Sequence, residues 1–315
     1  DQLFYAGYSR AIGDWLLGMN ATRLYTLKYG KDRQVLSVGR VQTPTLAMVV
    51  ERYLSILNFK PQPYWELQTT YRDILFRYEK GRFLSKEEGS MVAEMVKQEA
   101  FEVSNITKKK GKEYAPKLFD LTGLQVYCNT KFSLTAEQTL TIAQKLYEQK
   151  LITYPRVDTT FLPNDIYPKV SGILKQLSKY QSLCEPLLQK KIKKSSKVFN
   201  DKKVTDHHAI IPTGVEMYLS ADQGKVYDAI TRRFIAAFYP DCEVANTQVT
   251  GEAGDYSFKT NGKQILSHGW KVVFQLNKKE IDQDQSILPD LVNGEKGTHS
   301  PSFLDKETTA PNHFS

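Results

Sequence analysis

Two strand-like stretches of the sequence lie on either side of a long helical stretch, and this order limits how the chain can fold. Apolar and polar residues alternate within about 60–107 and again within 244–276, a period typical of half-buried strands. Much of the sequence between them repeats apolar residues at helical spacing. A helical domain inserted into one β domain explains this order. The alternative is two separate small β domains, each with a thin core.

Shorter elements are predicted inside these stretches. Helices are expected over residues 1–58 with a break at Gly39, over 85–97, over 121–150 as helix, short turn and helix, over 166–180, and over 222–238. Strands are expected over 64–71, 74–78, 101–107, 244–249, 256–259 and 270–276. Residues 108–112 and the final residues around Pro289, Pro301 and Pro311 are expected to be loops.

Local signals support several of these boundaries. Arg72 and Asp73 separate two strand patterns, which indicates a β-hairpin. Thr43 followed by Pro44 is typical of an N-cap and the first residue of a helix. Ser85 with Glu88 three residues later forms a capping-box pattern.

Composition narrows the class of protein. At 315 residues, the chain is too long for one ordinary core and predicts two or three domains. Its 41% hydrophobic and 25% charged residues are typical of a folded protein. The three cysteines (Cys128, Cys184 and Cys242) are far apart, which excludes a disulfide scaffold and a Cys-rich zinc site and fits a reducing compartment.

Neither a membrane span nor a leader is predicted. No apolar run approaches the ~20 residues that a membrane span needs. The chain opens with Asp1 and lacks a charged region followed by an apolar one, so we expect no signal peptide and a start inside a longer protein.

Positive charge is concentrated in the body of the chain. Residues 281–315 carry six acids and two lysines, a net charge of −4. The rest of the chain carries +12, which gives the whole chain a net charge of +8. A basic body suggests a polyanionic partner. The densest group is formed by the lysines at 190, 191, 193, 194, 197, 202 and 203. A solvated surface is the favoured interpretation of that group, although it would add salt-sensitive affinity for nucleic acid.

The segment Leu151–Thr159 contains the residues best suited to covalent chemistry. A tyrosine such as Tyr154 is a weak nucleophile at its normal pKa of about 10, and it can form a covalent intermediate if cations stabilise the phenolate and the attacked phosphate. Pro155 favours extended geometry at Tyr154, which places Arg156 on the same face, and its guanidinium suits bidentate contact with phosphate. By itself, this triplet is also compatible with a strand end beside a surface arginine.

Four motifs together resemble type IA DNA topoisomerases, most closely the bacterial topoisomerase III subgroup. IAQKLYE at 142–148 followed by LITYPR at 151–156 is similar to the active-site signature of the family. The other matches are DWLLGMN at 14–20 with Thr22 and Arg23, LSVGRVQTPTL at 36–46, and DHHAIIPT at 206–213. All four occur in the order of the family and span most of the chain.

The resemblance implies catalytic roles for three residues. Tyr154 would attack the DNA backbone and form a 5′-phosphotyrosine, and Arg156 would position Tyr154 and the scissile phosphate. His207 would assist phosphate binding or proton transfer, whereas His208 receives no catalytic role. Val157 departs from the family, which often has Ser or Thr there.

The resemblance also implies residues that bind single-stranded DNA. Arg10, Arg40, Gln42 and Thr43 match positions in the DNA groove of the family, and Asp158 matches the acid just after the catalytic arginine. Other interpretations remain open: Arg10 can pair with Asp14 at i,i+4 on one helix face, and Thr43 is explained as an N-cap. His207 and His208 are also compatible with an ordinary polar loop.

The fold implied by the resemblance is multi-domain with α and β parts: a fragment of the type IA topoisomerase toroid with a β arch domain and a helical, CAP-like gate domain. Residues 1–58 would be part of the helical base domain, 60–117 plus 240–300 the arch and hinge, 118–239 the gate domain with the active-site tyrosine, and 301–315 the start of the return to the base domain.

The N-terminal Toprim domain of the family, which carries its Mg²⁺ site, is not found in this sequence. The chain is therefore expected to be a central fragment that is inactive alone. Mg²⁺ is expected in the full-length enzyme and no cofactor or metal in this fragment. Asp282 and Asp284 have metal-ligand spacing, but they lie in a polar segment and are assigned no metal.

The activity implied for the whole enzyme is transient cleavage of one DNA strand, strand passage and religation without ATP, giving relaxation or decatenation. Its partners would be single-stranded DNA and supercoiled or catenated DNA, with no membrane. The protein would be a monomer in the bacterial cytoplasm, associated with the nucleoid.

Two other functions remain open from the residues. A DNA-binding module could use the helix-turn-helix pattern at 121–150 to bind duplex DNA with sequence specificity. A hydrolytic nuclease would need a cluster of metal-binding carboxylates, and no convincing cluster is found.

Overall fold

A computed structural model describes residues 1–32, 34–274 and 284–314. The chain divides into two compact units. The first unit consists of Asp1–Glu66, Arg82–Gly89 and Leu304–Ser315, and the second of Leu67–Gly81 and Ser90–Phe303. Each unit is described separately below.

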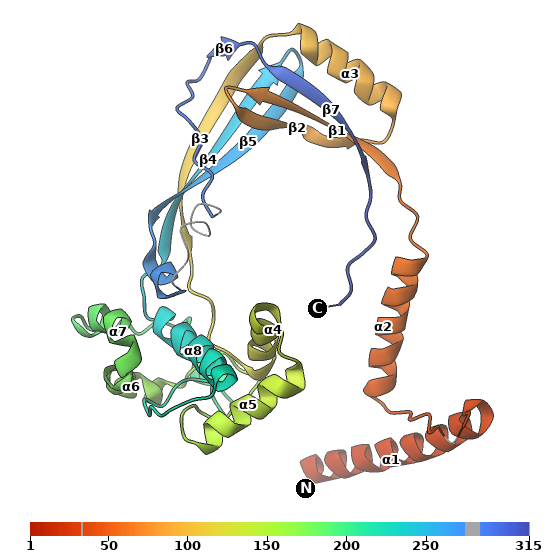
Figure 1. Ribbon diagram of the computed structural model, residues 1–315, viewed down its shortest axis with the longest axis vertical. Coiled ribbons are helices and arrows are strands. Elements are labelled where there is room, and N and C mark those ends of the chain that lie inside the picture. Colours follow the sequence, from red (N-terminus) through yellow and green to blue (C-terminus); the bar gives the residue numbers. More distant parts are fainter. Residues whose placement is uncertain (33, 275–283, 315) are drawn as a thin grey trace. The chain divides into compact units, whose positions relative to one another are not determined.

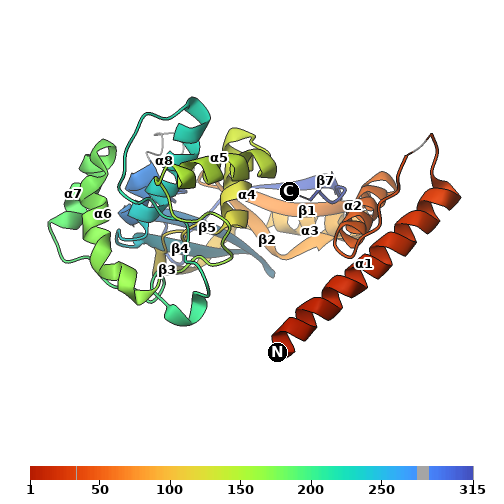
Figure 2. The ribbon, with the colours of Figure 1, turned by 90° about the horizontal axis from the view of Figure 1, so that it is seen from below.

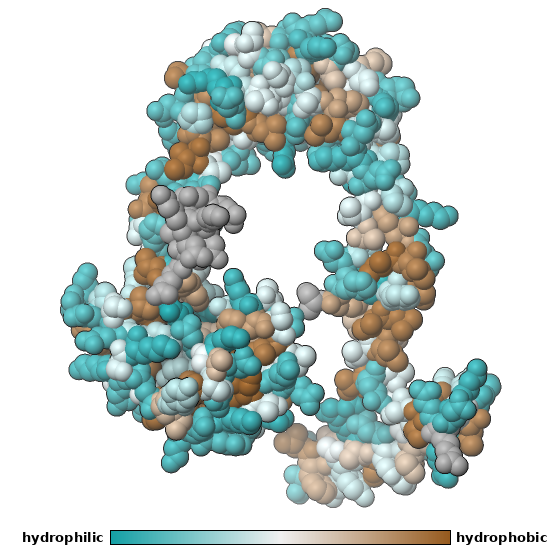
Figure 3. Space-filling model, viewed as in Figure 1, coloured by the Kyte–Doolittle hydropathy of each residue, from teal (hydrophilic) through white to brown (hydrophobic). Residues whose placement is uncertain are grey.

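The first unit contains two helices that bury none of their residues. These are α1 (Gln2–Tyr29) and α2 (Gln42–Leu57). Apolar side chains such as Trp15 and Leu46 are exposed on them, and Figure 3 shows a hydrophobic band over α2. Exposed apolar patches of this kind mark surfaces that pack against another partner. Two helices separated near Gly39 confirm the sequence-based prediction.

The predicted N-cap at Thr43 is wrong. Helix α2 begins at Gln42, and the residue before it, Val41, makes no side-chain cap. The Thr43 hydroxyl instead accepts a hydrogen bond from the Gly39 N–H at 3.0 Å, which closes the turn that leads into the helix. A threonine hydroxyl can bond a nearby backbone N–H either from the cap position or from inside the first turn. The Thr-Pro pattern therefore places the start of a helix only to within about one residue.

Strands from both strand-like stretches form one seven-stranded sheet, in the order β6-β3-β4-β5-β2-β1-β7 (Figure 1). The long antiparallel pairing of β3 with β4 runs from Phe101 opposite Ala253 to Glu113 opposite Cys242. Two separate β domains are therefore excluded. The strands are β1 (Pro63–Tyr71), β2 (Ile74–Phe83), β3 (Phe101–Glu113), β4 (Cys242–Ala253), β5 (Tyr256–Ser267), β6 (Lys296–Gly297) and β7 (Ser300–Glu307).

The hairpin predicted at Arg72-Asp73 is confirmed, since both residues have positive φ, 49° and 63°, between β1 and β2. The loop predicted at 108–112 is wrong. Those residues continue β3, because β4 pairs with them throughout. The loop predicted for the final residues is confirmed around Pro289 and Pro311 and wrong around Pro301, which lies in β7. Long-range pairing of this kind leaves no local signal in a lysine-rich or proline-containing segment.

The strand predicted at 270–276 is wrong as well. Residues Gly269–Phe274 form a 3₁₀ helix, and 275–276 lie outside the described residues. Gly269 has a φ of 50°, a conformation that turns the chain out of β5. The turn buries Lys271, whose side chain is only 7% exposed.

Lys271 belongs to a cluster of four charges that joins distant parts of the second unit. Both Lys263 and Lys271 bind the carboxylates of Glu113 and Asp284, and the two Lys263 contacts are 2.6 Å long. Burial raises the pKa of these carboxyl groups, but the hydrogen bonds from the two ammonium groups outweigh it and lower the pKa of both. The cluster ties the end of β3 to β5, to the 3₁₀ helix and to the segment after it.

The other main part of the second unit is helical. Figure 2 shows α4, α5 and α8 close together, with α6 beside α7. The helix, short turn and helix predicted over 121–150 are confirmed, whereas 166–180 is broken into 3₁₀ turns around α6, with Pro168 inside the first of them. The helices are α3 (Lys86–Gln98), α4 (Leu121–Phe132), α5 (Ala136–Glu148), α6 (Val170–Gln176), α7 (Gln181–Leu188) and α8 (Ala221–Ala236).

The core of this helical part contains two of the three cysteines, and all three are free and buried. Burial raises the pKa of the Cys128 and Cys184 thiols to about 11. The pKa of Cys242 is also raised by burial. Thiols in such surroundings are unreactive, because the thiolate is the nucleophilic form.

Helix α5 ends in a Schellman motif that leads directly into the segment of Tyr154. The Leu151 N–H donates to the Leu146 carbonyl at 2.9 Å, and the Lys150 N–H donates to the Tyr147 carbonyl at 2.8 Å. Lys150 has a φ of 61°, a left-handed conformation that glycine adopts more easily.

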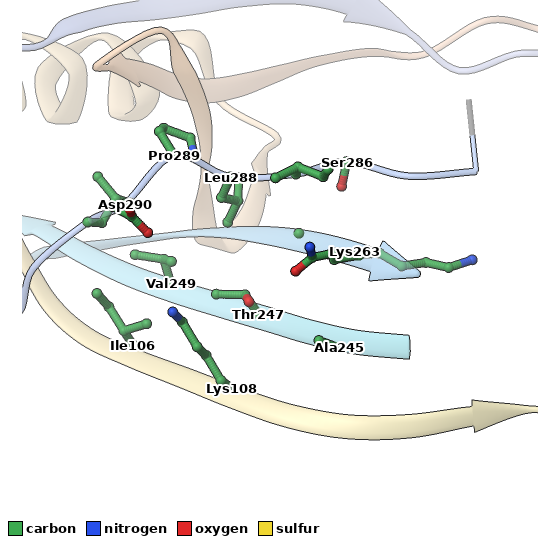
Figure 4. A pocket seen from close by; sticks show the side chains of 14 residues that line it. Ile106, Lys108, Ala245, Thr247, Val249, Lys263, Ser286, Leu288, Pro289 and Asp290 are labelled. Atoms are coloured by element: carbon green, nitrogen blue, oxygen red, sulfur yellow. The ribbon is translucent and has the colours of Figure 1, made fainter. Parts of the chain in front are cut away.

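A strap, residues 286–291, crosses the sheet and closes a hollow of about 380 Å³ (Figure 4). Lys263 and Ser286 exchange two backbone hydrogen bonds of 2.9 and 3.0 Å, and Leu288 points from the strap toward the sheet. Gly262 packs against Ser286 and Leu288 of the strap. A Cβ there would come within 2.6 Å of Leu288 and 2.9 Å of the Ser286 carbonyl, so only glycine fits without displacing the strap.

Gly262→Ala is therefore expected to destabilise the chain by about 1–3 kcal/mol, the usual cost of overpacking. Urea unfolding followed by circular dichroism measures this change. Gly224→Ala is the control, because Gly224 lies inside α8 with nothing within 4 Å, and alanine there should stabilise by about 0.5–1 kcal/mol. Equal effects of the two substitutions would contradict the role of the strap.

Lys150→Gly is expected to stabilise the chain by about 1 kcal/mol, because it removes the cost of a left-handed lysine. Lys145→Gly, at an exposed position in the last turn of α5, should destabilise by up to about 1 kcal/mol. Thermal unfolding of both variants beside the unchanged chain provides the comparison. A loss of stability with Lys150→Gly would show that the strain at this residue is negligible.

Candidate active site

The segment of Tyr154 is held in place by a second segment, residues 209–213. Its anchor is Thr153, whose hydroxyl accepts a hydrogen bond from the Ile211 N–H at 3.0 Å and donates one to the Ala209 carbonyl at 3.2 Å. The Thr153 N–H donates to the Ile211 carbonyl at 3.0 Å. This short pairing joins two of the motifs found in the sequence, although they lie more than fifty residues apart.

Side chains in the segment alternate between the core and the outer surface. Pro155 and Val157 are buried, whereas Tyr154 is half-buried and Arg156 and Asp158 are exposed. Arg156 therefore lies on the outer side together with Tyr154, as extended geometry predicts. Neither Arg156 nor Asp158 forms an ion pair with any residue in the described ranges, so both side chains are available to a ligand.

The ring of Tyr154 lies between two other rings. The centroid of the His207 ring is 4.5 Å away with an interplanar angle of 42°, and that of Tyr147 is 5.4 Å away in an edge-to-face arrangement of 77°. Such contacts restrict the rotation of a side chain and contribute about 0.5–1.5 kcal/mol beyond burial. The Tyr154 hydroxyl forms no hydrogen bond within the part of the chain that the structure describes.

The two neighbouring histidines differ in their surroundings. His207 is exposed and contacts Tyr154, whereas His208 is half-buried and its Nδ1 lies 2.8 Å from the Ala209 carbonyl. Of the two histidines, only His207 is therefore placed beside the candidate nucleophile.

Two of the four predicted DNA-binding residues of the first unit line another hollow, of about 780 Å³. Arg40 and Gln42 line it together with Asp14. The Arg40 guanidinium contacts the Asp14 carboxylate at 2.6 and 3.3 Å, and the Gln42 amide donates to the Ser37 hydroxyl at 2.7 Å. The alternative pairing of Arg10 with Asp14 is wrong, because Asp14 pairs with Arg40.

Arg10 is exposed on α1, and Thr43 closes the turn before α2 as described above. Neither lines the hollow around Arg40. The structure thus brings Arg40 together with Gln42 in the first unit, and Tyr154 together with His207 in the second.

Sequence reasoning missed three residues of these sites: Tyr147, Thr153 and Asp14. Tyr147 lies within the active-site signature, one residue before the end of α5, and this position could have indicated a contact with Tyr154. Thr153 and Asp14 act through partners distant in sequence, so no local signal pointed to them.

The described residues include no group of three or more His, Cys, Asp or Glu that could hold a metal ion. The side chains around Tyr154 therefore do not fit a Mg²⁺ site of their own. Asp282, one of the two residues with metal-like spacing, lies outside the described residues, and Asp284 binds two lysines. Among the described helices, none has the length and apolar character needed to cross a membrane.

Comparisons with known proteins identify relatives of this chain. DNA topoisomerase 3 of Bacillus licheniformis is 36% identical over 328 residues, which cover 100% of this chain and 45% of that protein. DNA topoisomerase 3 of Bacillus subtilis is 36% identical over 310 residues, which cover 94% of this chain and 42% of that protein. The chain thus spans less than half the length of these relatives.

The fold matches a solved structure of full-length topoisomerase I from Thermotoga maritima, with a TM-score of 0.73 and 22% sequence identity over 98% of this chain and 51% of that one. The resemblance to type IA topoisomerases found in the four motifs is confirmed, and so is the mixed α and β fold that it implied. A family model described as DNA topoisomerase matches residues 1–315, and the chain therefore belongs to the DNA topoisomerase family.

Proposed function

We propose that this chain is part of a type IA DNA topoisomerase in which Tyr154 transiently cleaves one DNA strand. The observation that carries the proposal is the position of Tyr154: in a chain of this family, its ring is fixed between His207 and Tyr147 while its hydroxyl is left without a partner in the described ranges. A nucleophile must be held in place and have its reacting atom free.

The proposed reaction exchanges one phosphoester bond for another. The Tyr154 oxygen forms a bond to phosphorus, and the bond from phosphorus to the 3′-oxygen of the neighbouring nucleotide breaks. The phenol proton passes, in net terms, to the released 3′-hydroxyl. The 5′ end remains attached to the protein as a phosphotyrosine, and attack by the 3′-hydroxyl reverses both changes. Because the number of phosphoester bonds is unchanged, resealing needs no ATP.

His207 and Arg156 would assist this step in different ways. His207 lies against the ring of the nucleophile and is exposed, so it can bind the phosphate or transfer a proton. Arg156 lies on the same outer face, and its guanidinium forms no ion pair within the described residues, which leaves it free for two parallel hydrogen bonds to phosphate oxygens. Asp158 is exposed two residues further and would contact the DNA strand near its sugars or bases.

The hollow around Arg40 in the first unit would hold single-stranded DNA. Arg40 and Gln42 present a cation and an amide to one hollow, a combination that suits the phosphate and the base or sugar of a strand. Asp14 holds the Arg40 fork in place by ion pairing. Arg10, on α1, and Thr43, in the first turn of α2, would add further contacts.

The domain assignment from the sequence is retained as part of the proposal, with 118–239 as the moving gate and 60–117 plus 240–300 as the arch. Mg²⁺ would be bound by residues outside the described part of this chain, and no step here is assigned to it. The whole protein would be a monomer that acts on supercoiled or catenated DNA at the bacterial nucleoid.

The proposed polarity can be tested in the full-length protein that contains this chain. After denaturation, a single-stranded oligonucleotide labelled at its 3′ end should remain covalently attached to the protein, whereas a 5′ label should be released. Tyr154→Phe should abolish the adduct, because the attacking oxygen is removed. Tyr147→Phe, which keeps the ring contact, is the control and should retain it. An adduct that persists in Tyr154→Phe would assign the nucleophile elsewhere.

The role of His207 can be separated from that of its neighbour. His207→Ala should lower the rate of adduct formation by about 10²-fold, the lower end of the usual contribution of an acid–base group. His208→Ala should leave the rate within about threefold, because His208 contacts its own backbone neighbour. Rapid-quench measurement of the adduct gives both rates. Equal losses in the two variants would contradict a specific role for His207.

A further inference from the structure

A second basic site lies beside the two linkers that join the sheet to the helices in the second unit. One linker follows β3 and leads to α4, and the other leads from α8 into β4 (Figure 1). Residues 114–118 of the first linker and 237–241 of the second line a common hollow of about 720 Å³. This volume lies within the range of ligand-binding pockets. Tyr154, Arg156 and His207 do not line it.

The hollow is strongly basic. Five exposed lysines line it, against two carboxylates, Asp241 and Glu243. None of the five forms an ion pair with a residue in the described part of the chain. Their charges therefore remain available to an anion that enters the hollow. The lysines are Lys112, Lys117, Lys193, Lys197 and Lys203.

Two aromatic rings position three of these lysines. The Lys197 ammonium lies 2.9 Å from the centroid of the Tyr114 ring, and the Lys203 ammonium lies 4.7 Å from that of Phe161. Lys117 also lies over Phe161, at 6.0 Å. Cation–π contacts hold an ammonium group without neutralising its charge.

These features select the chemistry of the ligand. Unneutralised ammonium groups attract phosphates, and contacts to phosphates carry no sequence information. The hydroxyls of Ser195 and Ser196 also line the hollow and can donate to phosphate oxygens. The expected ligand is thus a chain of phosphates recognised without regard to sequence.

We propose that this hollow binds the sugar–phosphate backbone of a DNA strand, at a site separate from the one around Tyr154. The choice of DNA as the polyanion rests on the proposed function. The linkers that line the hollow connect the strand pair β3–β4 to the helices that carry Tyr154. A bound strand would therefore contact the point where the helical part leaves the sheet.

The test uses the full-length protein and fluorescence anisotropy of one labelled DNA sequence, as a single strand and as a duplex, over a series of salt concentrations. The neutral variant is Lys117→Gln/Lys197→Gln/Lys203→Gln, which removes three charges and keeps the first two methylene groups of each stem. Its single-strand affinity should fall by about tenfold, and the slope of log K against log salt should decrease by about 2, since each phosphate contact contributes about 0.7.

Two further variants separate charge from packing. Lys117→Arg/Lys197→Arg/Lys203→Arg keeps the charges and should retain affinity and slope. Lys169→Gln/Lys175→Gln/Lys179→Gln neutralises three exposed lysines that do not line the hollow, and it should also leave both unchanged. An unchanged slope in the neutral hollow variant would overturn the proposal, and so would equal losses in its glutamine and arginine forms. The duplex series supports the site if its slope falls in parallel.

The same variants distinguish this proposal from the proposed function. The covalent adduct at Tyr154 should still form on a short oligonucleotide in the neutral hollow variant, because the hollow lies outside the reacting residues. A normal adduct together with an unchanged salt slope in the neutral variant would reject DNA binding in the hollow and leave the proposed function intact. Absence of the adduct in the unmodified protein would reject the proposed function, whereas a lowered slope in the neutral variant would still establish the hollow.

Discussion

The candidate active site depends on the pairing of the Tyr154 segment with residues 209–213. Thr153 bonds through its side chain both to the N–H of Ile211 and to the carbonyl of Ala209. Backbone bonds from the Thr153 N–H to the Ile211 carbonyl and from the Thr213 N–H to the Leu151 carbonyl extend this pairing on either side, and they hold residues far apart in sequence next to one another. The aromatic contact between Tyr154 and His207 follows from this junction. A threonine suits the position, because its hydroxyl can donate and accept at once and its branched side chain has few rotamers.

Much of the fold could be predicted from the sequence, because several elements carry local signals. The hairpin at Arg72-Asp73 and the helix pair α4–α5 have turn residues or caps at fixed spacing. The errors occur where distant partners decide the structure. Lysines 108–112 extend a strand because β4 pairs with them, and the apolar run after His268 turns into a 3₁₀ helix around buried Lys271. For the candidate site, Tyr154 and His207 were found through motifs, whereas Tyr147, Thr153 and Asp14 were missed, since their roles depend on contacts across the fold.

Charge serves two different purposes in the second unit. In the cluster of Glu113, Lys263, Lys271 and Asp284, opposite charges satisfy one another, and the cluster fixes the end of β3 against its neighbours. In the basic hollow, aromatic rings hold the lysines while their charges remain free. Glu113 and Tyr114 are adjacent in sequence, so a structural clamp and a surface open to phosphate begin at neighbouring residues. This proximity gives the linkers both a firm attachment and an accessible charged face.

The buried cysteines have a practical consequence for measuring motion. Cys128, Cys184 and Cys242 are all buried with raised thiol pKa values, so maleimide reagents at neutral pH should leave them largely unmodified while the protein is folded. A pair of cysteines introduced at exposed positions, one in each unit, would then accept fluorescent dyes without removal of the native thiols. Energy transfer between such dyes would report the separation of the two units.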